Sequence, residues 1–385
     1  MAEKSIVHLV NLRDFGGVER LILDYVINGK EHNWVIINTA NSLNKRFNEH
    51  ANSIIFCNRA IQSAAIQIPS FIRKKALWNK IKKINPSHVV IWNQIVSLED
   101  KPDSIKAIYY DHGAVWEVEK NKKTIDFFKR IDGCICVSQA SKKILENKFE
   151  HRCDISVILN RTSVESRDSI IADEKKKTFT IGCAARFSPL KALGLLPLIA
   201  EETALRGFNF NFIIAGTGEE ESALASLIDK KNLKKSIKTI GFLDNLNDFY
   251  KHIDVYISTS AHETCSLSCI EAMSFGIPII SANIDGQPEI ISNGHTGFCI
   301  SPTLSMEDYC KKTGMSLPFQ KDIYYPENDT IGPPRLLSPK DAADKIIEIY
   351  LHGVDDYKKN SRHRAKELFD DKTFEENLIK IVRNF

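Results

Sequence analysis

Two glutamates eight positions apart are the residues of this chain that most clearly suggest chemistry. Glu263 and Glu271 lie in the string HETCSLSCIEAMSFGIP, residues 262–278. The apolar run before them, residues 254–260, predicts a strand, and the residues after Glu263 predict a helix carrying Glu271. A helix start favours anions through its free N–H groups. We therefore expect an anion such as a phosphate at the backbone amides that open this helix, which are those of Thr264, Cys265, Ser266 and Leu267.

Two cations follow another predicted strand. Arg186 and Lys191 lie in ARFSPLKALG, directly after the apolar run 179–185. Arginine can bind an oxyanion with two parallel hydrogen bonds, and lysine acts as a point charge. The pair could therefore bracket a diphosphate, and a solvated basic turn is the alternative.

Glycine loops follow two predicted strands. Gly16 and Gly17 precede a helical pattern, and Gly216 and Gly218 follow the apolar run 210–216. Glycine lets backbone amides approach a phosphate at a helix start. The spacing at Gly16 and Gly17 is not the one that dinucleotide binders use, and an ordinary turn is the alternative for each loop.

A histidine ends a further strand. His112 follows the run 107–110 in the segment YDHG. Its ring could donate a hydrogen bond to a sugar or stabilise positive charge that develops there. A purely structural histidine is the alternative, and Asp111 is a second candidate for contact with an acceptor.

The elements that must position these residues alternate along the chain. Short apolar runs predict strands, and the amphipathic segments between them, such as 18–27 and 124–131, predict helices. This alternation is typical of an α/β fold with parallel sheets buried on both faces. The predicted strands are residues 6–10, 34–40, 53–57, 88–92, 107–110, 134–138, 155–159, 179–185, 210–216, 236–242, 254–260, 277–281 and 297–301.

Two segments interrupt the alternation. Residues 165–177 are dense in charge and are predicted to link two domains. Residues 302–339 contain six prolines and are predicted to be a long loop, which is either functional or a passive insertion. Helical periodicity returns at Pro339, and residues 372–385 carry an apolar stripe that predicts a packed final helix.

Composition excludes several classes of protein. A net charge of +3 over 385 residues argues against a dedicated nucleic-acid binder. The nine cysteines contain no C-x-x-C pair, so no disulfide framework or zinc site is expected. The opening apolar run is too short for a signal peptide, and no apolar stretch approaches 18 residues. We expect a cytoplasmic protein, with attachment to a membrane surface left open.

The string from His262 to Pro278 resembles the E-x₇-E signature of retaining GT-B glycosyltransferases, in particular glycosyltransferase family four. The other motifs occur in that family's order, and the resemblance covers most of the chain outside 302–339. It implies a GT-B fold, in which two Rossmann-like domains face each other across a cleft. Residues 1–165, with the helix 372–385 packed back on them, would form the acceptor-side domain. Residues 166–371, with the insertion 302–339, would bind the nucleotide sugar.

The resemblance also implies roles for the residues above. Glu263 would hold hydroxyls of the donor sugar, and Glu271 the ribose of the nucleotide. Arg186 and Lys191 would neutralise the leaving diphosphate, and His112 would approach the transferring sugar. The remaining donor contacts would come from Gly16, Gly17, Gly216, Gly218, Phe242, Leu243, Thr264, Cys265, Ser266 and Leu267. No cofactor is implied, and no metal is expected, because the chain has no D-x-D motif to hold one.

The function implied is transfer of a sugar, with retention, from a nucleotide-diphosphate sugar to a glycan or lipid-linked saccharide. Bacterial surface polysaccharide or lipopolysaccharide synthesis is the expected setting. Contact with the inner face of the cell membrane could come from the basic, aromatic stretch 71–83, for which a solvated amphipathic helix is the alternative. A nucleotide-sugar epimerase of the same fold and a non-catalytic glycan-binding protein are the alternatives.

Overall fold

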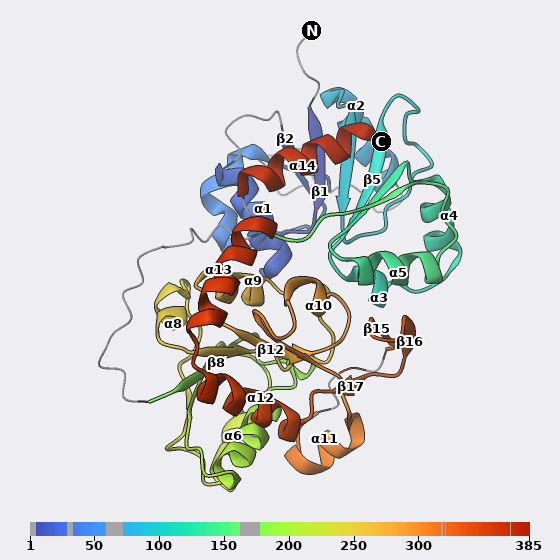
Figure 1. Cartoon of the computed structure of the whole chain (residues 1–385). Helices are drawn as coiled ribbons and strands as arrows, with labels where there is room; N and C mark the ends of the chain where they lie inside the picture. The colour runs from blue at the N-terminus through green and yellow to red at the C-terminus, as the bar shows by residue number, and fades with distance from the viewer. Residues whose placement is uncertain are drawn as a thin grey trace. The chain divides into compact units, whose positions relative to one another are not determined.

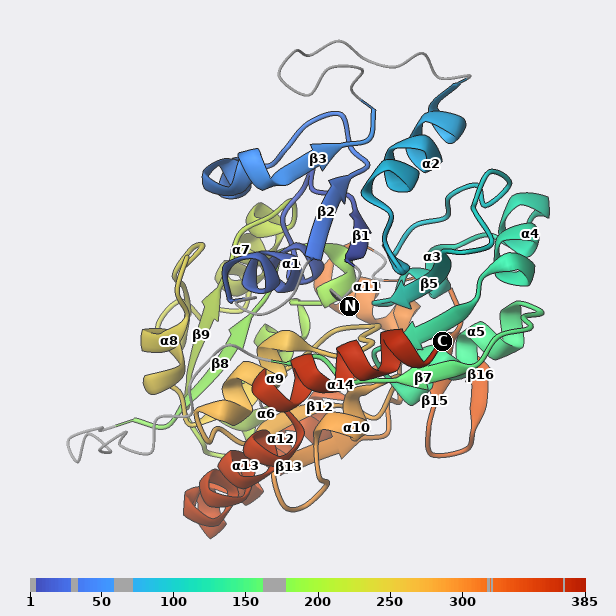
Figure 2. The same ribbon diagram turned by 90° about the horizontal axis from the view of Figure 1, so that it is seen from above.

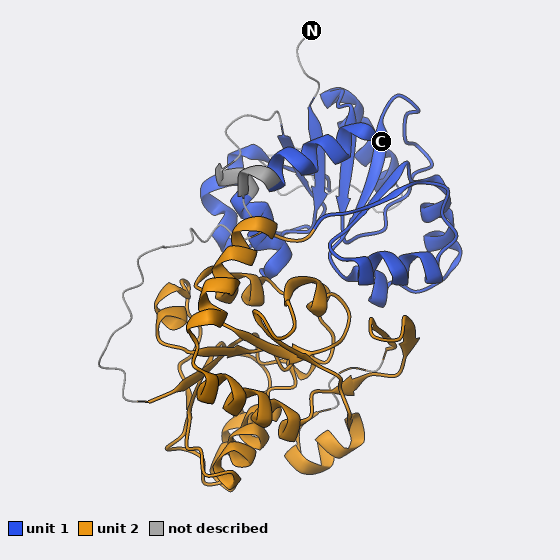
Figure 3. Cartoon of the chain, in the orientation of Figure 1, with its two compact units in different colours: residues 1–158, 372–385 blue, residues 159–371 orange. Residues whose placement is uncertain are grey.

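The computed structural model describes residues 5–28, 34–58, 72–161, 178–316, 319, 321–369 and 371–385. Contacts between backbone positions divide the chain into two compact units (Figure 3). Unit 1 is residues 1–158 with 372–385, and unit 2 is residues 159–371. The segment 165–177, which we expected to be a linker, lies outside the described residues.

Unit 1 contains a parallel sheet of seven strands, in the order β3-β2-β1-β4-β5-β6-β7 (Figures 1 and 2). The chain runs outward from β1 on one side and from β4 on the other. The ends of these two neighbouring strands therefore form the switch point where such sheets place ligands. The strands are β1 (Ile6–Val10), β2 (Trp34–Asn38), β3 (Ile54–Phe56), β4 (His88–Trp92), β5 (Lys106–Asp111), β6 (Gly133–Cys136) and β7 (Ile155–Val157). The helices are α1 (Gly17–Asn28), α2 (Arg73–Ile84), α3 (Ala114–Glu117), α4 (Lys122–Arg130), α5 (Gln139–Lys148) and α14 (Asp371–Asn384), with a 3₁₀ helix over Lys45–Ser53.

Unit 2 repeats this architecture with six parallel strands, in the order β10-β9-β8-β11-β12-β13. Its switch point lies between β8 and β11. The strands are β8 (Thr180–Ala184), β9 (Asn211–Ala215), β10 (Ile237–Thr239), β11 (Val255–Ile257), β12 (Ile279–Ala282) and β13 (Gly297–Ile300). The helices are α6 (Leu195–Leu205), α7 (Glu221–Lys230), α8 (Asn247–Lys251), α9 (Leu267–Ser274), α10 (Gln287–Ile290), α12 (Pro339–His352) and α13 (Asp355–Leu368).

The predicted strands are confirmed, each within the apolar run that predicted it or within one residue of its ends. Central strands such as β1 and β8 are buried along their whole length, as a parallel sheet covered on both faces requires. The polar residues that follow these strands therefore gather at the carboxyl edge of each sheet.

The last helix belongs to unit 1 although unit 2 precedes it in the chain. Phe374, Leu378 and Val382 are buried on one face of α14. A methyl group added at Gly133 would lie 2.4 Å from the Phe385 ring, so the chain end packs tightly on the start of β6. The stripe predicted from the sequence is thus the packing face of this helix.

The segment 302–339 is not the long loop that its prolines predict. It forms β14 (Leu304–Ser305), α11 (Met306–Thr313), a hairpin of β15 (Ile323–Tyr325) and β16 (Thr330–Gly332), and β17 (Arg335–Leu336). β14 pairs with β17, which closes the segment on itself. Buried side chains such as Tyr309 and Leu336 join it to the core of unit 2. The prediction failed because these strands are too short to show a periodicity.

The basic helix α2 buries its apolar face. Leu77, Trp78 and Ile81 are buried, and the Trp78 indole donates to the Ser97 carbonyl oxygen at 2.7 Å. The apolar side chains of this helix therefore contribute to the core of unit 1. Within the described residues, no helix is both long and apolar enough to cross a membrane.

Candidate functional site

Three loops of unit 2 pack against one another at the carboxyl ends of β8, β9 and β10. A Cβ atom on Gly216 would lie 1.9 Å from the Ala185 carbonyl oxygen, and one on Gly218 would lie 2.3 Å from that of Phe187. The Gly216 amide also donates to the Gly241 carbonyl oxygen at 2.7 Å. Glycine is required here because neighbouring backbone approaches so closely. Close packing of these loops therefore explains why residues 216 and 218 are glycines, which the sequence did not reveal.

Side chains on these loops differ in exposure. Arg186 is exposed, and the Phe242 ring is 55% exposed directly after Gly241. Leu243 is half-buried beside it. More than half of this aromatic ring is therefore in contact with solvent.

Lys191 and Glu263 are brought together at the switch point of unit 2. The Lys191 Nζ atom lies 2.6 Å from Glu263 Oε2, which also accepts a hydrogen bond from the Ser260 hydroxyl at 3.2 Å. Lys191 ends a short 3₁₀ turn after β8, and Glu263 follows β11. They line a cavity of about 10 Å³, which has room for about one water molecule.

The pair keeps Lys191 charged. Burial opposes its charge, but the attraction and hydrogen bond of the Glu263 carboxylate outweigh that effect, so the pKa of Lys191 is raised. The lysine is therefore a cation at all physiological pH values. Its side chain remains 25% exposed, so the charge can reach an incoming ligand.

Helix α9 begins beside this pair, three residues later than expected. It starts at Leu267, and the Ser266 hydroxyl caps it by accepting from the Cys269 amide at 3.4 Å. Thr264 and Cys265 belong to the loop before the cap. The Cys265 sulfur and carbonyl oxygen both accept hydrogen bonds from Asn160. The capping serine explains the later start, because it takes the amide that a longer helix would use.

Glu271 lies inside α9, where its carboxylate is bound by a tyrosine. It is 4% exposed, and its Oε2 accepts a hydrogen bond from the Tyr250 hydroxyl at 2.8 Å. Burial first and the Glu271 charge second raise the pKa of Tyr250, so this tyrosine stays a neutral donor. The structure gives Glu271 a fixed position on the side of α9 that meets α8.

One buried carboxylate that the sequence analysis missed holds the Glu263 loop in place. Asp285 is 0% exposed, and its Oδ2 accepts from the His262 ring at 2.8 Å and from the Glu263 amide at 3.2 Å. The Gly286 amide returns a bond to the Glu263 carbonyl oxygen at 3.3 Å. No sequence pattern singles out this aspartate, because it lies 22 residues from Glu263.

Asp285 also joins this loop to the 302–339 segment. Its Oδ1 accepts from the Tyr324 amide at 3.0 Å, and its own amide donates to the Tyr324 carbonyl oxygen at 2.9 Å. The His262 ring stacks on Phe319 with ring centroids 5.0 Å apart. The segment is therefore a support for the Glu263 loop.

In unit 1, His112 directly follows β5 and is half-buried. Its amide donates to Asn93 Oδ1 at 2.6 Å, and its ring stacks on Trp92 with centroids 4.9 Å apart and an interplanar angle of 9°. Asp111 is fully buried and accepts from Tyr109, Gly113, Val115 and Ser141. A role for Asp111 in contacting an acceptor is thus wrong, because its carboxylate is used to shape the turn before α3.

The other predicted residues of unit 1 open α1. Gly17 is its first residue, and the Gly16 amide donates to Glu19 Oε2 at 2.9 Å. The Glu19 carboxylate therefore occupies one of the amides predicted to meet a phosphate. Among the residues described, no three His, Cys, Asp or Glu side chains cluster in a way that could hold a metal ion.

Part of the chain matches a known protein family. Residues 165–313, which include all the charged residues discussed at the switch point of unit 2, match the family model described as glycosyl transferases group 1. An uncharacterized glycosyltransferase of Haemophilus influenzae is 26% identical over 219 residues, covering 56% of this chain and 59% of the relative. The 2-deoxystreptamine N-acetyl-D-glucosaminyltransferase of Niallia circulans is 26% identical over 213 residues, covering 55% and 52%. The chain thus spans about half the length of these curated relatives.

Solved structures extend the likeness to the whole fold. Anabaena HepE in complex with UDP and glucose has a TM-score of 0.71 and 17% identity, with 100% of both chains covered. Sucrose-phosphate synthase from Thermosynechococcus elongatus has a TM-score of 0.72 and 15% identity, with 99% of both chains covered. The chain therefore has the GT-B fold. Its resemblance to the group 1 glycosyltransferases, which are transferases, is confirmed.

Proposed function

We propose that this chain is a glycosyltransferase that moves a sugar from a nucleotide-diphosphate sugar to a saccharide acceptor. The observation that carries the proposal is the contact of Lys191 with Glu263, beside the start of α9. A cation and a helix start stabilise a leaving diphosphate, and a carboxylate holds sugar hydroxyls. One side of unit 2 thus supplies both kinds of group.

Donor binding would open the ion pair. The cavity at Lys191 is too small for a diphosphate, so the ammonium must exchange the Glu263 carboxylate for phosphate oxygens. Glu263 is then released to accept hydrogen bonds from the donor sugar. Arg186 would add a second positive charge, Phe242 and Leu243 would pack on the base, and Glu271 would hold the ribose.

The finer features of the reaction rest on the family resemblance. We propose retention of configuration, with the leaving phosphate taking the acceptor proton. Arg186, Lys191 and the α9 amides would supply the positive charge, so the proposal requires no metal. A glycan or lipid-linked saccharide of a bacterial cell surface is the proposed acceptor, made at the cytoplasmic side of the membrane. A UDP-sugar is the first donor to test, because Anabaena HepE binds UDP and glucose in its structure.

The test compares Lys191→Ala and Glu263→Gln with the wild type. Removing a charge that stabilises the leaving group lowers the rate constant about 100-fold. Lys191→Ala should therefore lower both the rate of sugar transfer and the rate of UDP-sugar hydrolysis by about that factor. Glu263→Gln should keep UDP binding within about twofold but slow transfer by at least about tenfold, because only the sugar loses its partner.

The matched controls are Lys238→Ala and Glu307→Gln, both on exposed side chains of unit 2. They should leave both measurements unchanged. A wild-type protein whose melting temperature responds to none of the UDP, GDP, ADP and CMP sugars would contradict the proposal. Interconversion of the donor sugar without transfer would instead indicate an epimerase.

A further inference from the structure

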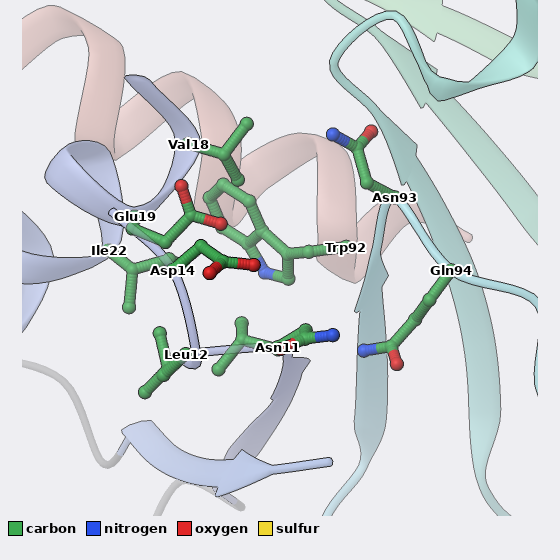
Figure 4. Close-up of a pocket in the computed structure, with 10 residues that line it drawn as sticks. Asn11, Leu12, Asp14, Val18, Glu19, Ile22, Trp92, Asn93 and Gln94 are labelled. Carbon is green, nitrogen blue, oxygen red and sulfur yellow. The ribbon is translucent and has the colours of Figure 1, made fainter. Parts of the chain in front are cut away.

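A separate pocket lies at the switch point of unit 1, where β1 and β4 end side by side (Figure 4). Its volume is about 220 Å³. Pockets for drug-sized ligands are about 300–1,000 Å³, so this one suits a single small ring. Residues from the loop after β1, from α1 and from the loop after β4 line it, and the predicted site residues are not among them.

The lining combines acidic and amide side chains with an apolar wall. Asp14 and Glu19 supply carboxylates, and Asn11 and Gln94 supply amides. Among the residues that the structure describes, no lysine, arginine or histidine lines the pocket. Figure 4 shows the amide groups of Asn11 and Gln94 directed toward each other across its lower side. Arg13 pairs with Asp14 at 3.2 Å, but both side chains are largely exposed, where such a pair is weak.

Gln94 shows that the pocket is prepared for a ligand oxygen. Its Oε1 accepts a hydrogen bond from the Thr39 hydroxyl at 2.8 Å, which fixes the orientation of the amide. Its Nε2 is buried and has no hydrogen-bond partner. A buried N–H group without an acceptor is costly, and a ligand hydroxyl would satisfy it.

The floor of the pocket is rigid and reaches His112. The Trp92 indole N–H donates to His8 Nδ1 at 3.0 Å, and its ring stacks on that of His112. Desolvation lowers the pKa of His8 to about 3, so His8 remains a neutral acceptor for this bond. Asn93, which also lines the pocket, binds the His112 amide. A ring bound here would therefore lie beside the residue predicted to approach the transferring sugar.

We propose that this pocket binds one hydroxyl-rich ring of the acceptor that bears no negative charge, and binds it more tightly when the ring carries an amine. Carboxylates and amide oxygens accept hydrogen bonds from hydroxyls, and the two carboxylates attract an ammonium group. The same charges repel a phosphate or carboxylate substituent. The inference rests on the proposed function, because it assigns the pocket to the acceptor of that transferase.

The experiment measures binding of glucosamine, glucose and glucose 6-phosphate to the full chain by saturation-transfer difference NMR. The wild type should bind glucosamine at least about tenfold more tightly than glucose 6-phosphate, with glucose between them. The variant D14N/E19Q keeps the shape of both side chains and should bring this ratio close to one. The matched control D103N/E150Q changes two exposed carboxylates of unit 1 and should keep the wild-type ratio.

Equal affinities for the three sugars in the wild type, or binding of none of them, would overturn the inference. A ratio that survives in D14N/E19Q would do the same, because the selectivity would then arise elsewhere. UDP binding is measured on the same samples. A chain that binds UDP but shows no such selectivity retains the proposed function and loses only this inference. Selective sugar binding without any nucleotide binding would support a sugar site in this pocket and contradict the proposed transferase function.

Discussion

At the scale of single residues, buried polar groups decide where the reactive ones lie. No sequence motif includes Asp285, yet its carboxylate accepts hydrogen bonds from the Glu263 amide, the His262 ring and the Tyr324 amide. A fully buried carboxylate with several donors holds those donors in one arrangement. We therefore regard Asp285 as a positioning residue for Glu263.

The substitution Asp285→Asn replaces one acceptor oxygen by an NH₂ group. We expect kcat for transfer to fall about tenfold, because the Glu263 loop loses its fixed position. UDP binding should remain near the wild-type value. Kinetics with a UDP-sugar check this, and Asp322→Asn, on an exposed side chain of the same supporting segment, is the control. Unchanged kcat in Asp285→Asn would exclude the positioning role.

His8 predicts a dependence of stability on pH. Its pKa is about 3 in the folded protein and 6.5 in the unfolded chain, so between these values the unfolded state binds the extra proton. The free energy of unfolding should therefore fall as pH falls, by about 2 kcal/mol between pH 7 and pH 5 from this group.

His8→Asn retains an acceptor for Trp92 and does not titrate, so this part of the loss should disappear. Urea unfolding of unit 1, followed by tryptophan fluorescence at the two pH values, measures it. His295→Asn, at an exposed position, should keep the wild-type dependence. An identical pH dependence in His8→Asn would show that another group is responsible.

At the scale of elements, the loops after β8, β9 and β10 contact one another because glycines in them leave room for neighbouring backbone. Gly216 has a φ of +133° and meets the backbone of the Arg186 loop. Gly207 also has a positive φ, of +86°, but nothing lies within 4 Å of the Cβ that it lacks. A substitution at Gly207 therefore tests backbone strain alone, whereas a substitution at Gly216 tests strain together with close packing.

Gly216→Ala should lower the free energy of unfolding by about 3 kcal/mol or more, since strain and a backbone clash combine. Gly207→Ala should cost about 1 kcal/mol from strain alone. Denaturant unfolding of unit 2 measures both. Equal losses would contradict the argument that loop packing requires Gly216.

At the scale of the molecule, the chain builds each unit with its own switch point and then returns to unit 1. Leu378 on α14 is 1% exposed, although more than 200 residues separate it from the rest of unit 1. The final helix is thus part of the core of unit 1, whose other residues all lie before residue 159.

Leu378→Ala should destabilise unit 1 by about 3 kcal/mol, because it leaves a cavity under α14. Hydrogen exchange should then speed up in peptides of β5 and β6, while peptides of β8 and β11 keep their protection. Leu351→Ala, at a position of α12 that is 67% exposed, should change neither set. Faster exchange throughout unit 2 would contradict the assignment of α14 to unit 1.

The sequence by itself determined the strands, the alternation with helices and the charged residues that follow β8 and β11. These features are local, because apolar runs and turn residues act over a few positions. They were sufficient to predict an α/β fold with parallel sheets and to name Lys191 and Glu263, whose roles stay a proposal. The GT-B fold, which is confirmed, was implied by the family resemblance of the motifs.

Only the tertiary structure decided which of these residues meet. It paired Lys191 with Glu263, joined Glu271 to Tyr250, and showed Asp285 and the 302–339 segment as supports. It also revealed the acidic pocket between β1 and β4. Contacts of this kind join positions tens of residues apart through the order of strands in a sheet, and residue spacing along the chain does not carry that information.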